Sequence, residues 1–60
     1  MGIKFYVGDE NKWDEEKVEW TKATFPKNAY NLIDAGWSYA EYYIEFIDEK
    51  DALLFRLRWQ

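Results

Sequence analysis

The chain contains neither cysteine nor histidine, and this absence constrains its fold more than any other feature. A domain of 60 residues buries only about 60% of the surface that its unfolded chain exposes, so its stability is marginal. Small domains often compensate with disulfides or a bound metal, for which cysteine and histidine are the usual ligands. Packing must supply the stability here, and four tryptophans, five tyrosines and four phenylalanines are available for it. We expect one domain over residues 1–60 with an aromatic core.

The net charge is −4, from twelve acidic and eight basic residues. This charge disfavours nonspecific attraction to nucleic acid or to an anionic membrane. The sequence has no leader of the secretory type, and no apolar run approaches the ~18 residues of a membrane span. We therefore expect a cytoplasmic protein, of a cell or of a virus-infected host, without a signal peptide or a transmembrane segment.

The first two predicted strands differ in the clarity of their pattern. Residues 3–7 alternate between apolar and polar side chains, which is the period of a strand, and Gly8 begins a turn. Further on, Val18 and Trp20 share a strand face, which predicts a second strand over Lys17–Ala23. Acidic residues also favour the first turn of a helix, so Lys12–Glu19 is open to interpretation as loop, strand or helix.

A helix is predicted in the middle of the chain. Thr24 is a favourable N-cap, and Pro26 suits a first turn, where its missing N–H costs nothing. The apolar spacing predicts a helix over Phe25–Ala35 that ends at Gly36. Its buried stripe consists of Phe25, Ala29, Leu32 and Ile33. On this interpretation, Leu32→Ala should cost roughly 2–5 kcal/mol.

The last third of the chain predicts a β-hairpin. Two apolar segments, 39–47 and 52–59, flank the polar run 48–51. One register places apolar pairs on one face and tyrosine or ion pairs on the other, and a slip of one residue would destroy both sets. The predicted pairs are Phe46–Leu53, Ile44–Phe55, Tyr42–Leu57, Tyr43–Arg56 and Glu41–Arg58.

Together these segments predict an α+β domain in the order β-β-α-β-β. Its four-stranded, mostly antiparallel sheet would carry one short helix packed on one face. The helix side of the sheet would be lined by Ile3, Phe5, Val7, Val18, Trp20, Tyr42, Ile44, Phe46, Leu53, Phe55 and Leu57. In architecture alone, and without a shared motif, this order resembles the small immunoglobulin-binding domains of bacterial surface proteins.

The sequence lacks the groups that most enzymes use. Ser38 is the only serine, and no histidine is present to activate it. Asp9, Asn11 and Asp14 loosely match a calcium loop, but the glycine of the sharp turn is missing and the twelfth position is Trp20. We therefore expect no enzymatic activity, no cofactor and no metal site.

The second face of the predicted sheet is the candidate binding surface, because one helix leaves it uncovered. It would carry Lys4, Tyr6, Glu19, Thr21, Glu41, Tyr43, Glu45, Leu54, Arg56 and Arg58. Tyrosine and arginine are enriched in protein interfaces. We therefore place a partner-binding site on Tyr6, Tyr43, Arg56 and Arg58, centred on Tyr43 and Arg56. The alternative is a solvent-facing sheet with cross-strand ion pairs.

A rival site is Trp13, whose neighbours in the predicted acidic loop Asp9–Glu16 are polar. This side chain either folds back as a lid over the core or stands exposed as an anchor, and an exposed tryptophan often supplies binding energy. Such an acidic loop would suit a basic partner.

The favoured function is a small non-enzymatic protein-binding module, an inhibitor or adaptor of the kind that phages and mobile elements encode. One alternative is nucleic-acid binding through the open face, with Tyr6 and Tyr43 stacking on bases. In it Lys4, Arg56 and Arg58 would meet phosphates, but glutamates on the same face oppose this function. Another is a homo-oligomeric structural piece, a homodimer with the open face as its symmetric interface.

Overall fold

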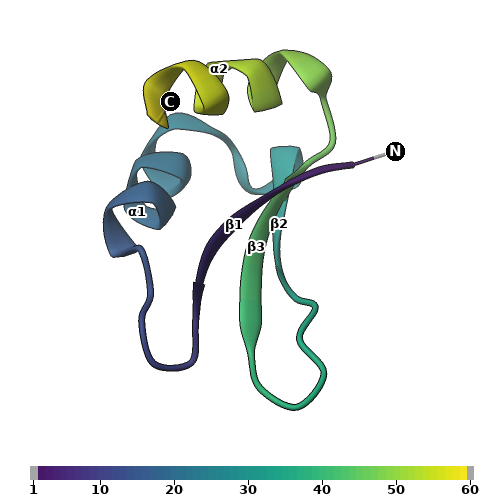
Figure 1. Ribbon diagram of the computed structural model, residues 1–60. Helices are drawn as coiled ribbons and strands as arrows, with labels where there is room; N and C mark the ends of the chain where they lie inside the picture. The colour runs from purple at the N-terminus through teal and green to yellow at the C-terminus, as the bar shows by residue number, and fades with distance from the viewer. Residues whose placement is uncertain (1, 60) are drawn as a thin grey trace.

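The computed structural model describes residues 2–59 as one three-stranded sheet with two helices. The elements are β1 (Ile3–Asp9), α1 (Glu15–Thr24), a single 3-10 turn (Lys27–Ala29), β2 (Tyr30–Asp34), β3 (Glu41–Phe46) and α2 (Glu49–Trp59). The antiparallel sheet has the order β1-β3-β2, so β3 is its central strand. Both helices pack against one side of the sheet, and the loop that joins β2 to β3 extends away from α2 (Figure 1).

The predicted β-β-α-β-β order, with four strands and one helix, is therefore wrong, although the small α+β class is confirmed. Two predicted strands belong to helices, and the segment predicted as a helix holds one 3-10 turn followed by strand β2. The resemblance to the small immunoglobulin-binding domains depended on the predicted order of elements, so it does not hold either. Within residues 2–59, no helix has the length and apolar composition that crossing a membrane requires.

The segment predicted as a strand over Lys17–Ala23 belongs to α1, because the signals at its start favour a helix. The side chain of Asp14 accepts a hydrogen bond from the Lys17 backbone N–H (3.3 Å), which caps the first turn. Two glutamates follow in that turn, where the helix dipole stabilises negative charge. Val18 and Thr21, one turn apart, are the buried residues of α1.

The helix predicted over Phe25–Ala35 is wrong, because Pro26 adopts an extended conformation (φ −69°, ψ 159°) and only one 3-10 turn follows it. The chain then pairs with β3 as strand β2, placing Leu32 opposite Ile44. Leucine and isoleucine suit a strand as well as a short helix, and the pairing with β3 decides between the two. Gly36 does not end a helix: it lies in the loop after β2, where a Cβ would clash with the carbonyl oxygen of Tyr39.

The predicted hairpin is half right, since residues 41–46 form strand β3 but residues 52–59 belong to α2. Asp48 starts this helix by accepting a hydrogen bond from the Lys50 N–H (2.9 Å). All of the predicted pairs between the two segments are therefore wrong: Phe46–Leu53, Ile44–Phe55, Tyr42–Leu57, Tyr43–Arg56 and Glu41–Arg58. In the sheet, Ile44 pairs with Phe5 and Leu32 instead.

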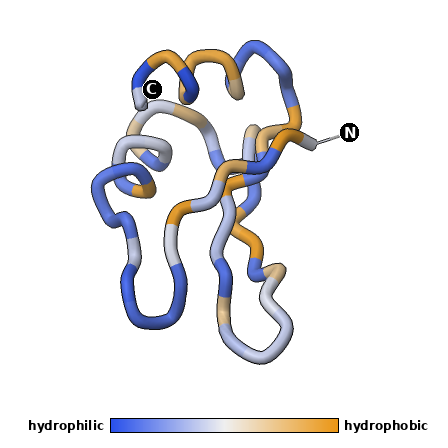
Figure 2. Tube along the Cα trace, in the orientation of Figure 1, coloured by the Kyte–Doolittle hydropathy of each residue, from blue (hydrophilic) through white to orange (hydrophobic). Residues whose placement is uncertain are grey.

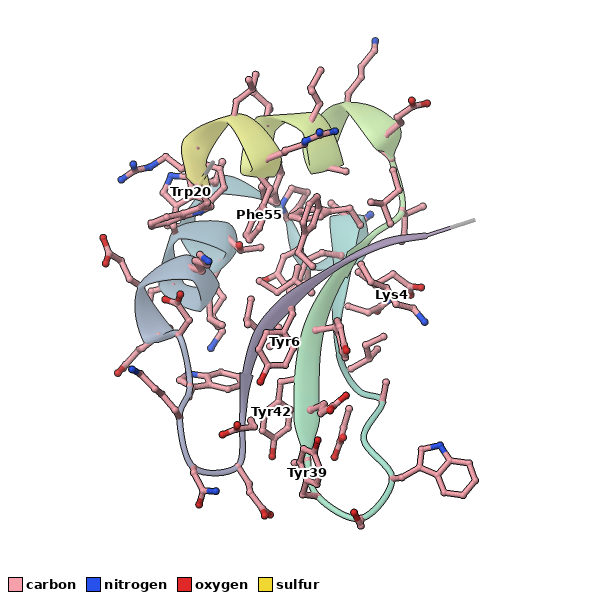
Figure 3. The ribbon with its side chains drawn as sticks, in the orientation of Figure 1. Lys4, Tyr6, Trp20, Tyr39, Tyr42 and Phe55 are labelled. Carbon is pink, nitrogen blue, oxygen red and sulfur yellow. The ribbon has the colours of Figure 1, made fainter. Side chains whose placement is uncertain are left out.

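The core lies between the sheet and the helices. Its buried apolar residues are Val7, Val18, Phe25, Ile44, Phe46, Ala52 and Phe55. Phe46 is fully buried, and its ring centroid lies 5.1 Å from that of Phe25 and 5.4 Å from that of Phe55. Figure 3 shows Phe55 and Trp20 in the space between the two helices. The core therefore joins strand β3 to both helices.

Three residues expected on the helix side lie at the surface instead. Ile3 is exposed because it is the first residue of the edge strand β1. Leu53 and Leu57 are exposed because they lie on the side of α2 away from the core. Leu32, expected in the core, is 43% exposed on the edge strand β2.

We predict that truncations in β3 and β2 differ sharply in their effect on the free energy of unfolding. Phe46→Ala should cost about 3–5 kcal/mol, enough to unfold much of so small a domain. Ile44→Val should cost about 0.5–1.5 kcal/mol and stay folded. Leu32→Ala should cost only about 1 kcal/mol or less, because its side chain is half exposed. Urea denaturation followed by circular dichroism measures all three, and a larger loss for Leu32→Ala than for Phe46→Ala would contradict the fold.

Candidate functional site

The side of the sheet away from the helices is an uncovered surface, here called the open face. Strand alternation sets its members, because Ile44 and Phe46 point to the buried side and their neighbours point to the other. The open face consists of Lys4, Tyr6, Asp9, Asn31, Ile33, Glu41, Tyr43 and Glu45. Across the strands these residues form rows, with Tyr6 opposite Tyr43 and Tyr43 opposite Ile33.

An aromatic pair occupies the middle of the open face. The rings of Tyr6 and Tyr43 meet edge to face, with centroids 5.6 Å apart and planes at 70°. Tyr6 is 52% exposed, so its ring is available to a partner. Because the two tyrosines stand on paired strands, their backbones are held rigidly, and an aromatic ring on such a base loses little entropy on binding.

A carboxylate joins this pair to a third tyrosine. The Tyr43 hydroxyl donates a hydrogen bond to Glu41 Oε1 (3.4 Å). Contact with the same carboxylate raises the pKa of Tyr39, in the loop before β3. Partial burial raises the pKa values of Tyr6 and Tyr43. The negative charges of Asp9 and then Glu41 add to the shift of Tyr6, and that of Glu41 adds to the shift of Tyr43. Glu41 thus acts on all three members of a tyrosine cluster, Tyr6, Tyr39 and Tyr43. Figure 3 shows Tyr6 and Tyr39 on the half of the sheet nearer the β2–β3 loop.

The two arginines expected on this surface lie elsewhere. Arg56 and Arg58 belong to α2, in the other layer of the molecule, so the prediction that they share a face with Tyr43 is wrong. The Arg58 guanidinium stands over the Trp59 ring, with its Cζ 4.6 Å from the ring centroid. Arg56 borders a groove between β1 and α2 together with Glu49. Lys4 is the only basic residue of the open face.

Trp13 combines the two roles considered for it. Its ring packs edge-on against Tyr42, with centroids 5.1 Å apart, and it remains 40% exposed. A bridge to Gly8, whose φ of 136° favours glycine, holds the loop against β1. Trp13 therefore packs on Tyr42, a residue at the margin of the core, and also lines a cleft of ≈ 520 Å³ that Tyr6 borders.

The weak calcium-loop pattern forms a turn instead. Asp9 Oδ1 accepts hydrogen bonds from the backbone N–H groups of Asn11 (2.9 Å) and Lys12 (2.8 Å). This carboxylate thus stabilises the turn after β1. In the described part of the chain, no three acidic side chains come together in an arrangement that would hold a metal ion.

The sequence pattern identifies part of the tyrosine cluster and misses the rest. It predicts Tyr6 and Tyr43 on one face, and the structure brings them together. Tyr39 is missed, although it has the same parity as Glu41 and Tyr43 along the chain, and that alternation is a usable signal. Trp37, in the same loop as Tyr39, is fully exposed and does not pack on the core.

Comparison of the chain with protein-family models, with curated proteins and with solved structures finds no match in any of the three. Function must therefore be inferred from the surface itself.

We predict that Glu41 contributes to the raised pKa values of all three tyrosines of the cluster. In the parent, Tyr6, Tyr39 and Tyr43 should ionise above the ordinary pKa of 10.0. Glu41→Gln removes the negative charge and should lower all three midpoints, as followed by ultraviolet absorbance. The matched control is Glu45→Gln, on the same face of β3, which should leave them nearly unchanged.

The same shifts predict how stability depends on pH. A tyrosine whose pKa is higher in the folded state than in the unfolded chain stabilises the fold below pH 10.0, and this stabilisation is lost as the pH rises further. The parent should therefore lose more unfolding free energy above pH 10.0 than Glu41→Gln does. Equal losses in the two proteins, or equal midpoints in Glu41→Gln and Glu45→Gln, would contradict the role of Glu41.

Proposed function

We propose that this protein is a non-enzymatic protein-binding module, an inhibitor or adaptor of the kind that phages and mobile elements encode, and that it binds through the open face. The observation that carries the proposal is the pair Tyr6–Tyr43 on two paired strands, with Glu41 hydrogen-bonded to one of them. Rigid, partly exposed tyrosines are typical of the residues that dominate binding energy in protein interfaces.

The charges of the open face indicate what kind of protein segment it suits. Asp9, Glu41 and Glu45 stand on it with Lys4 as the only base. A partner that offers lysine or arginine side chains gains from these carboxylates, and an arginine also stacks on tyrosine rings. We therefore propose a basic segment of another protein as the ligand.

Nucleic-acid binding through the open face has weaker support than protein binding. Tyr6 and Tyr43 are present to stack on bases, but Arg56 and Arg58 lie on α2 and cannot meet phosphates on this face. Three carboxylates repel a phosphate backbone, and Lys4 alone does not offset them. Self-association through the open face is opposed by the same excess of like charge.

The proposal includes no catalytic step and no cofactor. Ser38 lies in the exposed loop between β2 and β3, and the sequence holds no histidine to activate it. The cytoplasm remains the proposed compartment, and the absence of cysteine is compatible with it.

Selection from a displayed library of random peptides tests this function even though the partner is not identified. Peptides enriched on the immobilised parent should be rich in lysine and arginine, because the open face is acidic. Tyr43→Ala should weaken their binding by about 30-fold or more, the loss typical of a central interface residue. Trp13→Ala, which alters the rival cleft, should change the affinity little. Both variants must retain the circular dichroism spectrum of the parent.

Two outcomes would contradict the proposal. If Trp13→Ala loses binding and Tyr43→Ala does not, the cleft beside the loop is the binding site. If no peptide is enriched, or the enriched peptides bind Tyr43→Ala as tightly as the parent, the open face is not a protein-binding surface.

A further inference from the structure

The outer side of α2 carries an apolar stripe that the fold leaves uncovered. Ala52 and Phe55 face the core, and Trp59 packs against it. The opposite side of the helix presents Leu53, Leu54 and Leu57, which are 54%, 52% and 57% exposed. Figure 2 shows hydrophobic segments along α2, at the end of the molecule away from the β2–β3 loop. Three neighbouring half-exposed leucines on one helix are typical of a contact surface.

Charged residues border this stripe on both sides in a regular order. Successive residues of an α-helix are rotated by about 100° around its axis. Glu49 and Arg56 therefore lie on one side of the leucines, two turns apart. Both of them border the groove against β1, which places them on the same side. Asp51 and Arg58 lie on the other side with the same separation. Each flank thus has an acid near the start of the helix and a base near its end.

None of these four charges forms an ion pair within residues 2–59, and the guanidinium of Arg58 stands over the Trp59 ring. Among residues 2–59, the ion pairs are Lys17–Asp14 and Lys22–Glu19, both at the surface of α1. An acidic first turn and a basic last turn stabilise any helix through its dipole. The dipole does not account for three leucines left in water between the charged flanks. A partner that covers the leucines and pairs the charges accounts for both features.

We infer that this partner is a second copy of the chain, with the two α2 helices packed antiparallel about a two-fold axis. In that arrangement each charged flank of one helix faces the same flank of the other helix, and the two helices run in opposite directions. Glu49 of one copy then lies opposite Arg56 of the other, and Asp51 lies opposite Arg58. Leu53 meets Leu54 at the axis. Lys50, on the same side of the helix, lies opposite Leu57 of the other copy, where its ammonium group reaches water at the end of the contact. A parallel pair would instead place acids opposite acids.

The other occupants of such a stripe fit less well. An anionic membrane would attract Arg56 and Arg58 but repel Glu49 and Asp51 on the same flanks, whereas a second copy pairs all four charges. The contact is also small: an 11-residue helix is about 16 Å long. It therefore buries less than the ~1,600 Å² of a standard interface. We thus infer a weak, reversible homodimer that forms at high concentration. This dimer uses α2 and not the open face, so the test of the dimer is independent of the test of the proposed function.

Sedimentation equilibrium of the full chain from about 10 μM to about 1 mM tests the dimer. The mean mass of the parent should rise toward twice the chain mass of 7.3 kDa. Glu49→Arg alone, and Arg56→Glu alone, should each weaken association by at least about tenfold, because like charges then face each other. An equimolar mixture of these two variants should associate as well as the parent, since every facing pair is again of opposite sign. Glu19→Arg, on α1, is the matched control and should leave association unchanged.

The leucines are tested separately by Leu53→Gln, which should abolish association while its circular dichroism spectrum stays that of the parent. Several results would overturn the inference. They are a parent that stays monomeric at the highest concentration, a mixture of charge variants that stays dissociated, and a dimer that survives Leu53→Gln. A dimer lost in Tyr43→Ala and kept in Leu53→Gln would place the interface on the open face instead.

Discussion

The burial of Ile44 and Phe46 is the interaction on which the other elements rely for their positions. Both side chains are completely buried, and both belong to β3, the strand with a partner on each side. Phe46 contacts Phe25 after the first helix and Phe55 in the second, so one ring joins three parts of the chain. With no disulfide and no metal ligand of the cysteine or histidine type, little else can hold these parts together.

The same two side chains determine which surface is free. A strand turns successive residues to opposite faces, so burying Ile44 and Phe46 forces Tyr43 and Glu45 outward. The neighbouring strand β1 follows this parity until the bulge between Tyr6 and Gly8. The tyrosine pair and its carboxylate are therefore products of the core packing. The candidate site is as rigid as the sheet, which favours recognition of a partner without rearrangement.

The parts of the chain with a strict period of two are predictable from the sequence. Both β1 and β3 follow from that period, and so does the shared face of Tyr6 and Tyr43. Where several periods fit, the prediction fails. In residues 52–59 the leucines and Phe55 are so evenly distributed that a strand face and a helix face can both be drawn. The pattern is ambiguous because Leu53, Leu54 and Leu57 remain exposed after folding, which no rule for core residues anticipates.

Local signals fail in the middle of the chain for a different reason. Thr24 and Pro26 suit the start of a helix, yet residues 30–34 complete the sheet beside β3. Pairing with β3 is a contact between segments distant in sequence, and it outweighs a propensity of a few tenths of a kcal/mol per residue. For the site, the missing information is also long-range. The sequence places Arg56 and Arg58 on the sheet only because residues 52–59 also fit a strand.

The division of the sheet into a buried face and an open face underlies both the fold and the proposed binding site. Nuclear Overhauser effects between ring protons in the parent protein test this division most directly. The structure predicts contacts between the rings of Tyr6 and Tyr43 and between those of Phe46 and Phe55, with sequential amide contacts of a helix along residues 49–59. Contacts between Cα protons of an antiparallel strand pair, joining Ile44 to Phe55 or Tyr43 to Arg56, would contradict it.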